Sequence, residues 1–232
     1  MSTTAYTLFD QIKSQLSSGD LFVEIGSERG GGSSLYFQNL ANETRNDFIT
    51  VDIDPIYFGP KIKTATMSGE LFVKNRLPEL NKQISIAFLD GFDWTYQPVT
   101  VRNGSASSDV FNKIDEYSKR NTTLNNVNSG VSHMTVISGM LPFMAEKCAV
   151  MFADTWFNHT TDTFCGKGVG AIYLLLAEGF HLLSNSYKSN YVLLGRNIQH
   201  RTVLPVLNLD RLSQKYDGLI KRADALLYDE PL

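Results

Sequence analysis

Length, composition and charge set the first limits on this chain. Its 232 residues, of which 43% are hydrophobic and 19% charged, are enough to bury one substantial core, so a single domain over 1–232 is predicted. The formal net charge is −3, and the lysines and arginines are scattered rather than clustered, which disfavours nucleic acid as a partner. Two cysteines are too few for a disulfide framework. The N-terminus has no secretory pattern and no apolar run approaches the roughly 20 residues of a membrane span, so a cytoplasmic protein is expected.

Apolar periodicity predicts helices and strands that alternate along most of the chain. The segment 5–18 has the three- and four-residue spacing of an amphipathic helix, and short apolar runs that predict strands follow it. The predicted strands are 21–25, 48–52, 62–66, 84–90 and 148–154. Helices are predicted from about Ser33, through 71–80, and over 131–146 and 168–178. The last two strands are apolar runs that each end in an aspartate, and such runs are typical of interior parallel strands.

The remaining segments complete this α/β pattern. Residues 95–130 are rich in Ser, Asn, Thr and Gly around a short helix near 109–120, which predicts a lid or an insertion. The runs at 180–187 and 190–197 predict a hairpin, and 208–227 a closing helix. Alternating strands and helices predict a Rossmann-like, doubly wound, mostly parallel sheet with helices on both faces. Such sheets bind ligands outside the carboxyl ends of their strands.

The most informative motif is the turn after the first strand, Glu24-Ile-Gly26-Ser-Glu-Arg-Gly30-Gly-Gly-Ser33. Glycines permit a positive φ and a close approach of the backbone to a ligand, and a helix that begins at about Ser33 directs N–H groups at the turn. The dinucleotide pattern G-x-G-x-x-G fails because Glu28 stands at its second glycine. The remaining pattern, E-x-G-x-x-x-G, offers a carboxylate for an ammonium and amides for a carboxylate, which are the two ends of a methionine moiety.

On these residues the chain resembles the class I S-adenosylmethionine-dependent methyltransferases, and in particular the small-molecule O-methyltransferases. The resemblance spans roughly 20–200 and implies a seven-stranded sheet with an antiparallel terminal strand. Its second element is Val51-Asp52-Ile53-Asp54-Pro55, where Asp52 is expected to accept hydrogen bonds from both ribose hydroxyls. Asp54 is the competing candidate for this role, and capping of a helix ahead of Pro55 is the structural alternative. Ser68 lies in the segment that faces adenine in the family, or it caps a helix. The expected cofactor-binding residues are Glu24, Gly26, Ser27, Gly30, Ser33, Asp52, Ile53, Ser68 and Asp90.

Two further strand ends carry acidic residues. The sequence Phe-Leu-Asp90-Gly-Phe-Asp93-Trp is similar to the F-I-D-G-D-H of small-molecule O-methyltransferases, although Phe-Asp replaces Asp-His. Asp154 resembles the carboxylate at the fifth strand end of metal-dependent members. If Asp90 and Asp154 converge, they offer oxygen ligands to Mg²⁺, which would orient and acidify a substrate hydroxyl; otherwise each only ends its strand. Asp90, Asp93 and His133 are the candidate catalytic residues, with His133 either a general base or an ordinary surface histidine.

The expected reaction is methyl transfer from S-adenosylmethionine to an oxygen of a small molecule, with nitrogen a less favoured acceptor. An NAD-dependent oxidoreductase on the same fold and a non-catalytic cofactor-binding protein are the alternatives. A homo-oligomer is left open. The segment Cys165-Gly166-Lys167-Gly168 is interpreted as a loop that begins a helix, or as a simple turn and cap.

Overall fold

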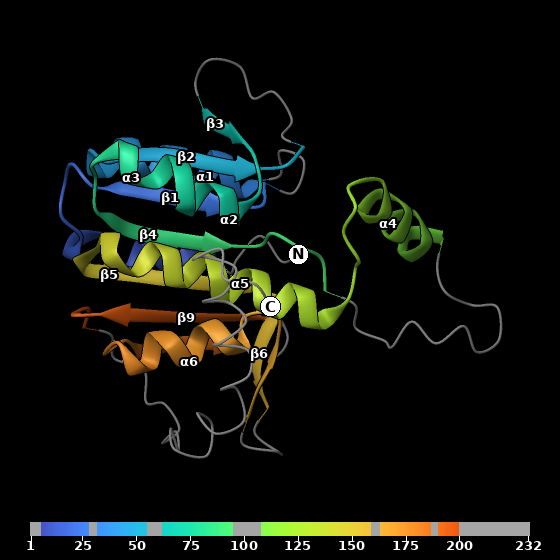
Figure 1. Ribbon diagram of the computed structural model, residues 1–232. Coiled ribbons are helices and arrows are strands. Elements are labelled where there is room, and N and C mark those ends of the chain that lie inside the picture. Colours follow the sequence, from blue (N-terminus) through green and yellow to red (C-terminus); the bar gives the residue numbers. More distant parts are fainter. Residues whose placement is uncertain are drawn as a thin grey trace.

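The computed structural model describes residues 6–27, 32–54, 62–94, 108–158, 163–186 and 190–199. At its centre is a seven-stranded sheet in the order β3-β2-β1-β4-β5-β9-β8 (Figure 1). The strands are β1 Leu21–Ile25, β2 Asp47–Asp52, β3 Lys63–Thr66, β4 Ile84–Leu89, β5 Met144–Ala153, β8 His181–Ser186 and β9 Tyr191–Arg196. Pairing is parallel from β3 to β5, and β9 is antiparallel to both of its neighbours. The predicted Rossmann-like sheet with an antiparallel strand is confirmed, as is the predicted hairpin.

Helices cover both faces of the sheet (Figure 1). On one face α1 (Gly32–Thr44) packs through Phe37 against Phe88 of β4, with ring centroids 5.3 Å apart. The other face carries α5 (Asn126–Met140), α6 (Val169–Ala177) and a helical segment made of α2 (Gly69–Leu71), η3 (Phe72–Arg76) and α3 (Leu77–Leu80). Because both faces are covered, every residue of β1 and β4 is buried, which explains why these strands are apolar apart from Glu24 and Ser85.

The direction in which strands are added reverses beside β1. The chain moves outward from β1 to β2 and β3, then returns to place β4 on the other side of β1. At such a reversal the following connections lie on opposite faces, so a crevice opens at the carboxyl ends of the strands. The turns after β1 and β4 nevertheless touch at their base, since a Cβ added to Gly26 would lie 2.4 Å from the nitrogen of Gly91. Helix α4 (Ser108–Lys119) lies beside these strand ends (Figure 1).

Three elements differ from the sequence predictions. The predicted helix over 5–18 is two 3₁₀ segments, η1 (Tyr6–Gln11) and η2 (Lys13–Gln15); the buried Phe9 and Ile12 are three residues apart, the repeat of a 3₁₀ turn. The predicted helix over 131–146 ends earlier, because Pro142 lies in the short 3₁₀ segment η4 (Leu141–Phe143) and β5 begins directly after it. The hairpin of β6 (Thr155–Asn158) and β7 (Thr163–Gly166) was not predicted.

Two other expectations concern the chain outside these elements. The predicted closing helix at 208–227 lies outside the described residues. In the part of the chain that is described, no helix combines the length and apolar character that a membrane crossing requires.

Candidate active site

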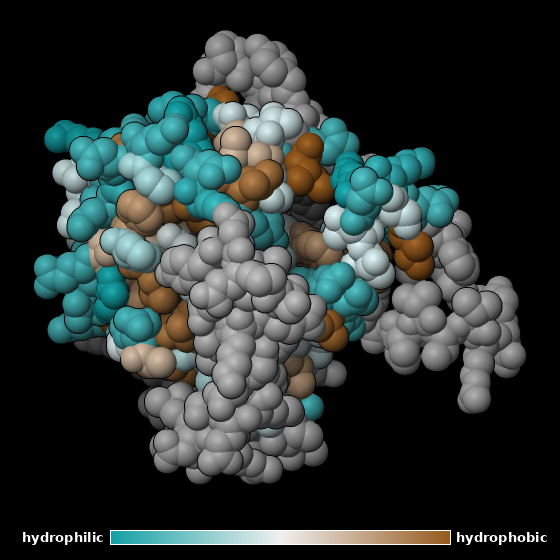
Figure 2. All heavy atoms as spheres, in the orientation of Figure 1, coloured by the Kyte–Doolittle hydropathy of each residue, from teal (hydrophilic) through white to brown (hydrophobic). Residues whose placement is uncertain are grey.

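A pocket of about 1380 Å³ lies at the carboxyl ends of β1 to β5, between these strand ends and α4 and α5. In the space-filling view of the same side, the surface is hollowed between the sheet and α4 (Figure 2). Eight of the sequence-predicted site residues line it: Gly26, Asp52, Ile53, Ser68, Asp90, Asp93, His133 and Asp154. Glu24, Ser27 and Ser33 are not among the lining residues, and Gly30 lies outside the described part of the chain.

Asp52 joins the end of β2 to the turn after β1. Its Oδ2 accepts hydrogen bonds from the backbone N–H and the hydroxyl of Ser27, each at 2.8 Å, and its Oδ1 accepts from the N–H of Asp54 at 3.0 Å. Ser27 itself is fully buried, so it supports Asp52 from behind rather than from the pocket. A carboxylate fixed in this way has lone pairs left over and needs little reorganisation to accept hydrogen bonds from a ligand.

Glu24 faces the start of α1 instead of the pocket. It is fully buried on β1, and its Oε2 accepts hydrogen bonds from the hydroxyls of Ser34 at 2.5 Å and Thr50 at 2.7 Å. Burial raises the pKa of Glu24 to about 7, against the opposing effect of these hydroxyls. Its Oε1 is buried without a hydrogen-bond partner among the described residues. Glu24 therefore positions the first turn of α1, next to the glycine-rich turn.

This buried carboxyl group predicts a pH-dependent difference between wild type and Glu24→Gln. The folded-state pKa of about 7 is above the ordinary glutamate pKa of 4.5, so the contribution of Glu24 to stability is complete below that ordinary value and is lost as the pH rises through about 7. Relative to Glu24→Gln, the wild-type free energy of unfolding should therefore fall by about 2.5 kcal/mol between pH 5 and pH 8. Urea unfolding of both proteins across this range measures it; a constant difference would contradict the assignment.

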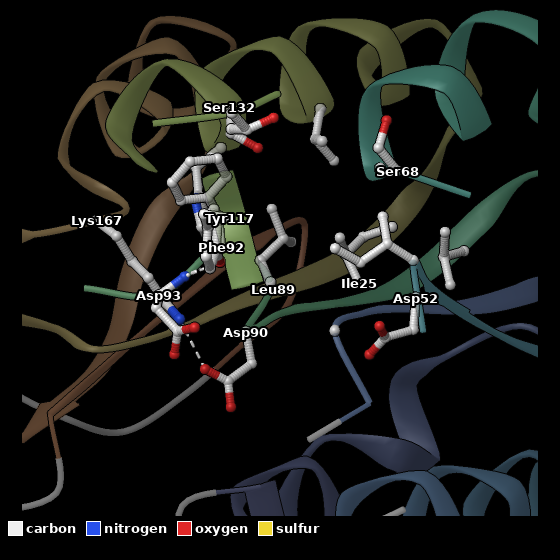
Figure 3. A pocket seen from close by; sticks show the side chains of 18 of the residues that line it. Ile25, Asp52, Ser68, Leu89, Asp90, Phe92, Asp93, Tyr117, Ser132 and Lys167 are labelled. Atoms are coloured by element: carbon white, nitrogen blue, oxygen red, sulfur yellow. Dashed lines mark hydrogen bonds and ion pairs between the residues drawn. The ribbon is translucent and has the colours of Figure 1, made fainter. Parts of the chain in front are cut away.

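Lys167 joins the two strand-end carboxylates that the sequence analysis singled out. Its Nζ lies 2.7 Å from Oδ1 of Asp90 (Figure 3). The same nitrogen lies 3.2 Å from Oδ2 of Asp154, and the Lys167 side chain is 1% exposed. Burial lowers the pKa of Lys167, but the charges of Asp90 and Asp154 more than reverse this, so its pKa is raised overall and it remains an ammonium. The two carboxylates thus converge, which the sequence analysis left as a condition, and they do so on a cation that belongs to the chain.

This arrangement does not fit the expected Mg²⁺. The ammonium of Lys167 stands between Asp90 and Asp154, where the metal was expected. Nor do the described residues contain a group of three or more His, Cys, Asp or Glu side chains placed to hold a metal ion. The expectation of a magnesium site formed by these two carboxylates therefore has no support.

Two glycines and a hairpin bring Lys167 to this place. Gly166 has φ +101°, and a Cβ there would lie 2.0 Å from the carbonyl oxygen of Asp154; a Cβ on Gly168 would lie 2.7 Å from the Phe152 ring. The N–H of Gly168 donates to Oγ1 of Thr155 at 2.9 Å, which closes the hairpin onto the strand end. Both glycines are therefore required for the close approach.

Sequence reasoning missed Lys167, although the sequence carries one signal for it. The residue lies between two glycines immediately before α6, whose segment VGAIYLLLA is strongly apolar. A cation at a helix N-terminus is disfavoured by the helix dipole, so a buried lysine there needs carboxylate partners. Lys167 could have been singled out on this ground, but the two aspartates could not have been chosen as its partners.

His133 lines the pocket from α5 but is poorly suited to accept a proton. Its Nδ1 lies 2.8 Å from the carbonyl oxygen of Ser129, and its Nε2 is buried without a hydrogen-bond partner among the described residues. Burial, followed by the charge of Lys167, lowers the pKa of His133 to about 3. The ring is therefore neutral near pH 7, and the geometry favours a hydrogen-bond acceptor over the expected general base.

Helix α4 holds Asp93 at the rim of the pocket. Lys113 of α4 forms an ion pair with the Asp93 carboxylate, and the N–H of Asp93 donates to the hydroxyl of Tyr117 at 2.8 Å. The Tyr117 ring packs against Phe92, with centroids 4.8 Å apart, and Phe92 has a left-handed backbone with φ +52°. Asp93 therefore connects the turn after β4 to α4 at the rim of the pocket.

Comparison with known proteins gives similarity at the level of the fold. No family model matches the sequence, and no curated protein matches it. One similar structure is described as a ribosomal RNA methyltransferase of Plasmodium falciparum (TM-score 0.48, 17% identity, 86% of this chain and 99% of that chain). A second is a methyltransferase structure from Streptococcus mutans in complex with S-adenosylhomocysteine (TM-score 0.41, 12% identity, 84% of this chain and 97% of that chain). A third is a Burkholderia thailandensis 1,6-didemethyltoxoflavin-N1-methyltransferase (TM-score 0.39, 11% identity, 83% of this chain and 76% of that chain). Similarity at these identities concerns the fold, so an activity has to be argued from the pocket itself.

Proposed function

We propose that this chain transfers a methyl group from S-adenosylmethionine to an oxygen of a small molecule. The charge of the pocket carries this proposal. Its described walls contain seven acidic side chains against three basic ones, an excess of four negative charges. The acidic residues are Asp52, Asp54, Glu70, Asp90, Asp93, Glu116 and Asp154, and the basic ones are Lys113, Arg120 and Lys167.

This charge separates the cofactors that a Rossmann-like sheet binds. S-adenosylmethionine carries a sulfonium and an ammonium against one carboxylate, so it is a net cation and is attracted to the pocket. NAD carries a pyrophosphate, which these carboxylates would repel, and the glycine turn lacks the dinucleotide pattern. The same repulsion disfavours a polyanionic acceptor such as RNA, and supports a neutral or cationic small molecule.

The wall formed by β2 and α2 suits the adenosine part of this cofactor. The fixed carboxylate of Asp52 supports this assignment, because it can still accept hydrogen bonds from the ribose hydroxyls. Ile53 and Leu71 line the same wall and remain 44% and 51% exposed. Large apolar side chains exposed in a pocket gain burial when a flat ring is placed against them. Ile25 and Leu89 lie between Asp52 and Asp90 in Figure 3, so this wall is separate from the ion pairs of Lys167.

The proposal is tested by titrating S-adenosylhomocysteine into wild type, Asp52→Asn and Asp54→Asn by calorimetry. Asp52→Asn should weaken binding 10- to 100-fold, because charge-assisted hydrogen bonds are worth about 1.5–3 kcal/mol each. Asp54→Asn removes the same charge from the same wall, but the Asp54 side chain is 79% exposed, so water and salt screen its charge. The affinity of this variant for S-adenosylhomocysteine should therefore differ from wild type by less than threefold. Binding of NAD in place of S-adenosylhomocysteine, or equal effects of both variants, would overturn the proposal.

A further inference from the structure

We propose that Lys167 takes the place of a divalent metal ion: its ammonium binds the hydroxyl oxygen of the methyl acceptor and stabilises the negative charge that develops there. The proposal rests on the methyl transfer proposed above and names the chemistry of the acceptor subsite. A metal at this position would act by holding and polarising the same oxygen.

The described contacts of Lys167 leave one of the hydrogen-bond donors of its ammonium unused. An ammonium has three N–H donors, and the contacts to Asp90 and Asp154 account for two of them among the described residues. Lys167 also lines the pocket. The third donor is therefore available to an oxygen that enters from the pocket.

The surroundings keep this cation in place and in its charged form. The Lys167 side chain is 1% exposed and Asp90 is 7% exposed, so their ion pair is shielded from water. Helix α5 packs against the lysine backbone, since a Cβ on Gly130 would lie 3.9 Å from the carbonyl oxygen of Lys167. His133 on the same helix is neutral and adds no competing charge. Lys167 is therefore a hydrogen-bond donor in this pocket, and not a proton acceptor.

The transfer can then be completed by the carboxylate that remains accessible. Asp154 is 24% exposed, compared with 7% for Asp90, so Asp154 is the one that an acceptor can reach. The acceptor oxygen forms a bond to the methyl carbon, the carbon–sulfur bond breaks, and its electron pair stays on sulfur as a neutral thioether. The hydroxyl proton passes to Asp154 as the oxygen attacks, so the negative charge that develops on the oxygen is stabilised by the Lys167 ammonium, and Asp154 then releases the proton to water.

Manganese binding tests the replacement without knowledge of the acceptor. Replacing Lys167 by alanine removes the ammonium that lies between Asp90 and Asp154. Hard divalent ions such as Mn²⁺ bind through one or two carboxylates and water, so they can take the place of the ammonium. Electron paramagnetic resonance titration of Mn²⁺ should therefore show binding to Lys167→Ala at least tenfold tighter than to wild type. The double variant Lys167→Ala/Asp154→Asn is the matched control and should lose this gain. Lys167→Gln, which keeps polar contacts in the site, provides the same test if Lys167→Ala does not fold.

Two results would overturn the proposal. One is wild-type Mn²⁺ binding that weakens in Asp154→Asn, since a metal would then share the site with Lys167. The other is no gain in binding when the ammonium is removed from a folded protein. Titration of S-adenosylhomocysteine in the same wild-type sample separates the two proposals. Failure to bind it would reject the proposed methyl transfer, whereas the manganese result would still report whether Lys167 occupies a cation site.

Discussion

Gly26→Ala is expected to lose about 3 kcal/mol or more of unfolding free energy, whereas Gly19→Ala loses about 1 kcal/mol. The two glycines have almost the same backbone, with φ +88° and +87°. An added methyl group therefore meets the same left-handed strain at both positions. At Gly26 it would also lie 2.4 Å from the nitrogen of Gly91 and 2.7 Å from the carbonyl carbon of Asp90, whereas nothing lies within 4 Å at Gly19. The excess loss at Gly26 measures the contact between the two turns.

Urea unfolding of both variants measures the difference, with equal slopes confirming that the same surface is exposed. Gly26→Ala should also lose its affinity for S-adenosylhomocysteine, because separating the turns after β1 and β4 widens the crevice between them. Gly19 lies before β1, at the opposite end of the strand, so its variant should bind as wild type does. Equal losses of stability in the two variants would show that the turns after β1 and β4 do not pack as described.

Lys167→Met is expected to lose about 3–5 kcal/mol of unfolding free energy at pH 7.5, since removing one partner leaves buried charge uncompensated. Asp90 and Asp154 would then face each other without the ammonium that lies between them. Lys113→Met is the matched control: Lys113 pairs with Asp93, but these side chains are 50% and 37% exposed. An exposed pair is worth less than about 1 kcal/mol.

The loss in Lys167→Met should shrink as the pH is lowered from 7.5 to 5. A proton bound by either Asp90 or Asp154 removes the repulsion in the folded variant, so the folded state binds protons more readily than the unfolded chain and gains stability as the pH falls. Urea unfolding of both lysine variants at the two pH values measures this. A loss that stays the same at both pH values would indicate that the damage comes from packing instead of charge.

Much of the pocket follows from the pairing of parallel strands. The apolar runs predict β1, β2 and β4 to within a residue, and in parallel pairs residues that follow the strands meet at one edge of the sheet. Leu89 pairs with Phe152, so the aspartates shortly after them, Asp90 and Asp154, are brought together. Their convergence was therefore predictable from sequence, and so was the place of Asp52.

The direction of Glu24 shows one limit of the same reasoning. Side chains of a strand alternate between faces, so Glu24 and Ile25 must point to opposite sides of the sheet. The sequence does not say which side α1 covers, and the structure places Glu24 against α1, with Ile25 lining the pocket. Lys167 shows a second limit, because its partner Asp90 is distant in the chain and the hairpin that delivers it has no clear apolar period.

The strand order also determines when the site is completed as the chain is made. Gly26, Asp52 and Asp90 precede α4, whereas Lys167 follows the β6–β7 hairpin. Proteins emerge from the ribosome N-terminus first, so β1 to β4 are available before β5 can pair with β4. At that stage β4 is an apolar edge strand, and the Lys167 ammonium has not yet been placed beside Asp90. Once the Gly166–Gly168 segment has been made, Lys167 pairs with Asp90 after β4 and with Asp154 after β5, and so connects the ends of these two strands. Nascent chains that stall before residue 166 should therefore depend most on chaperones.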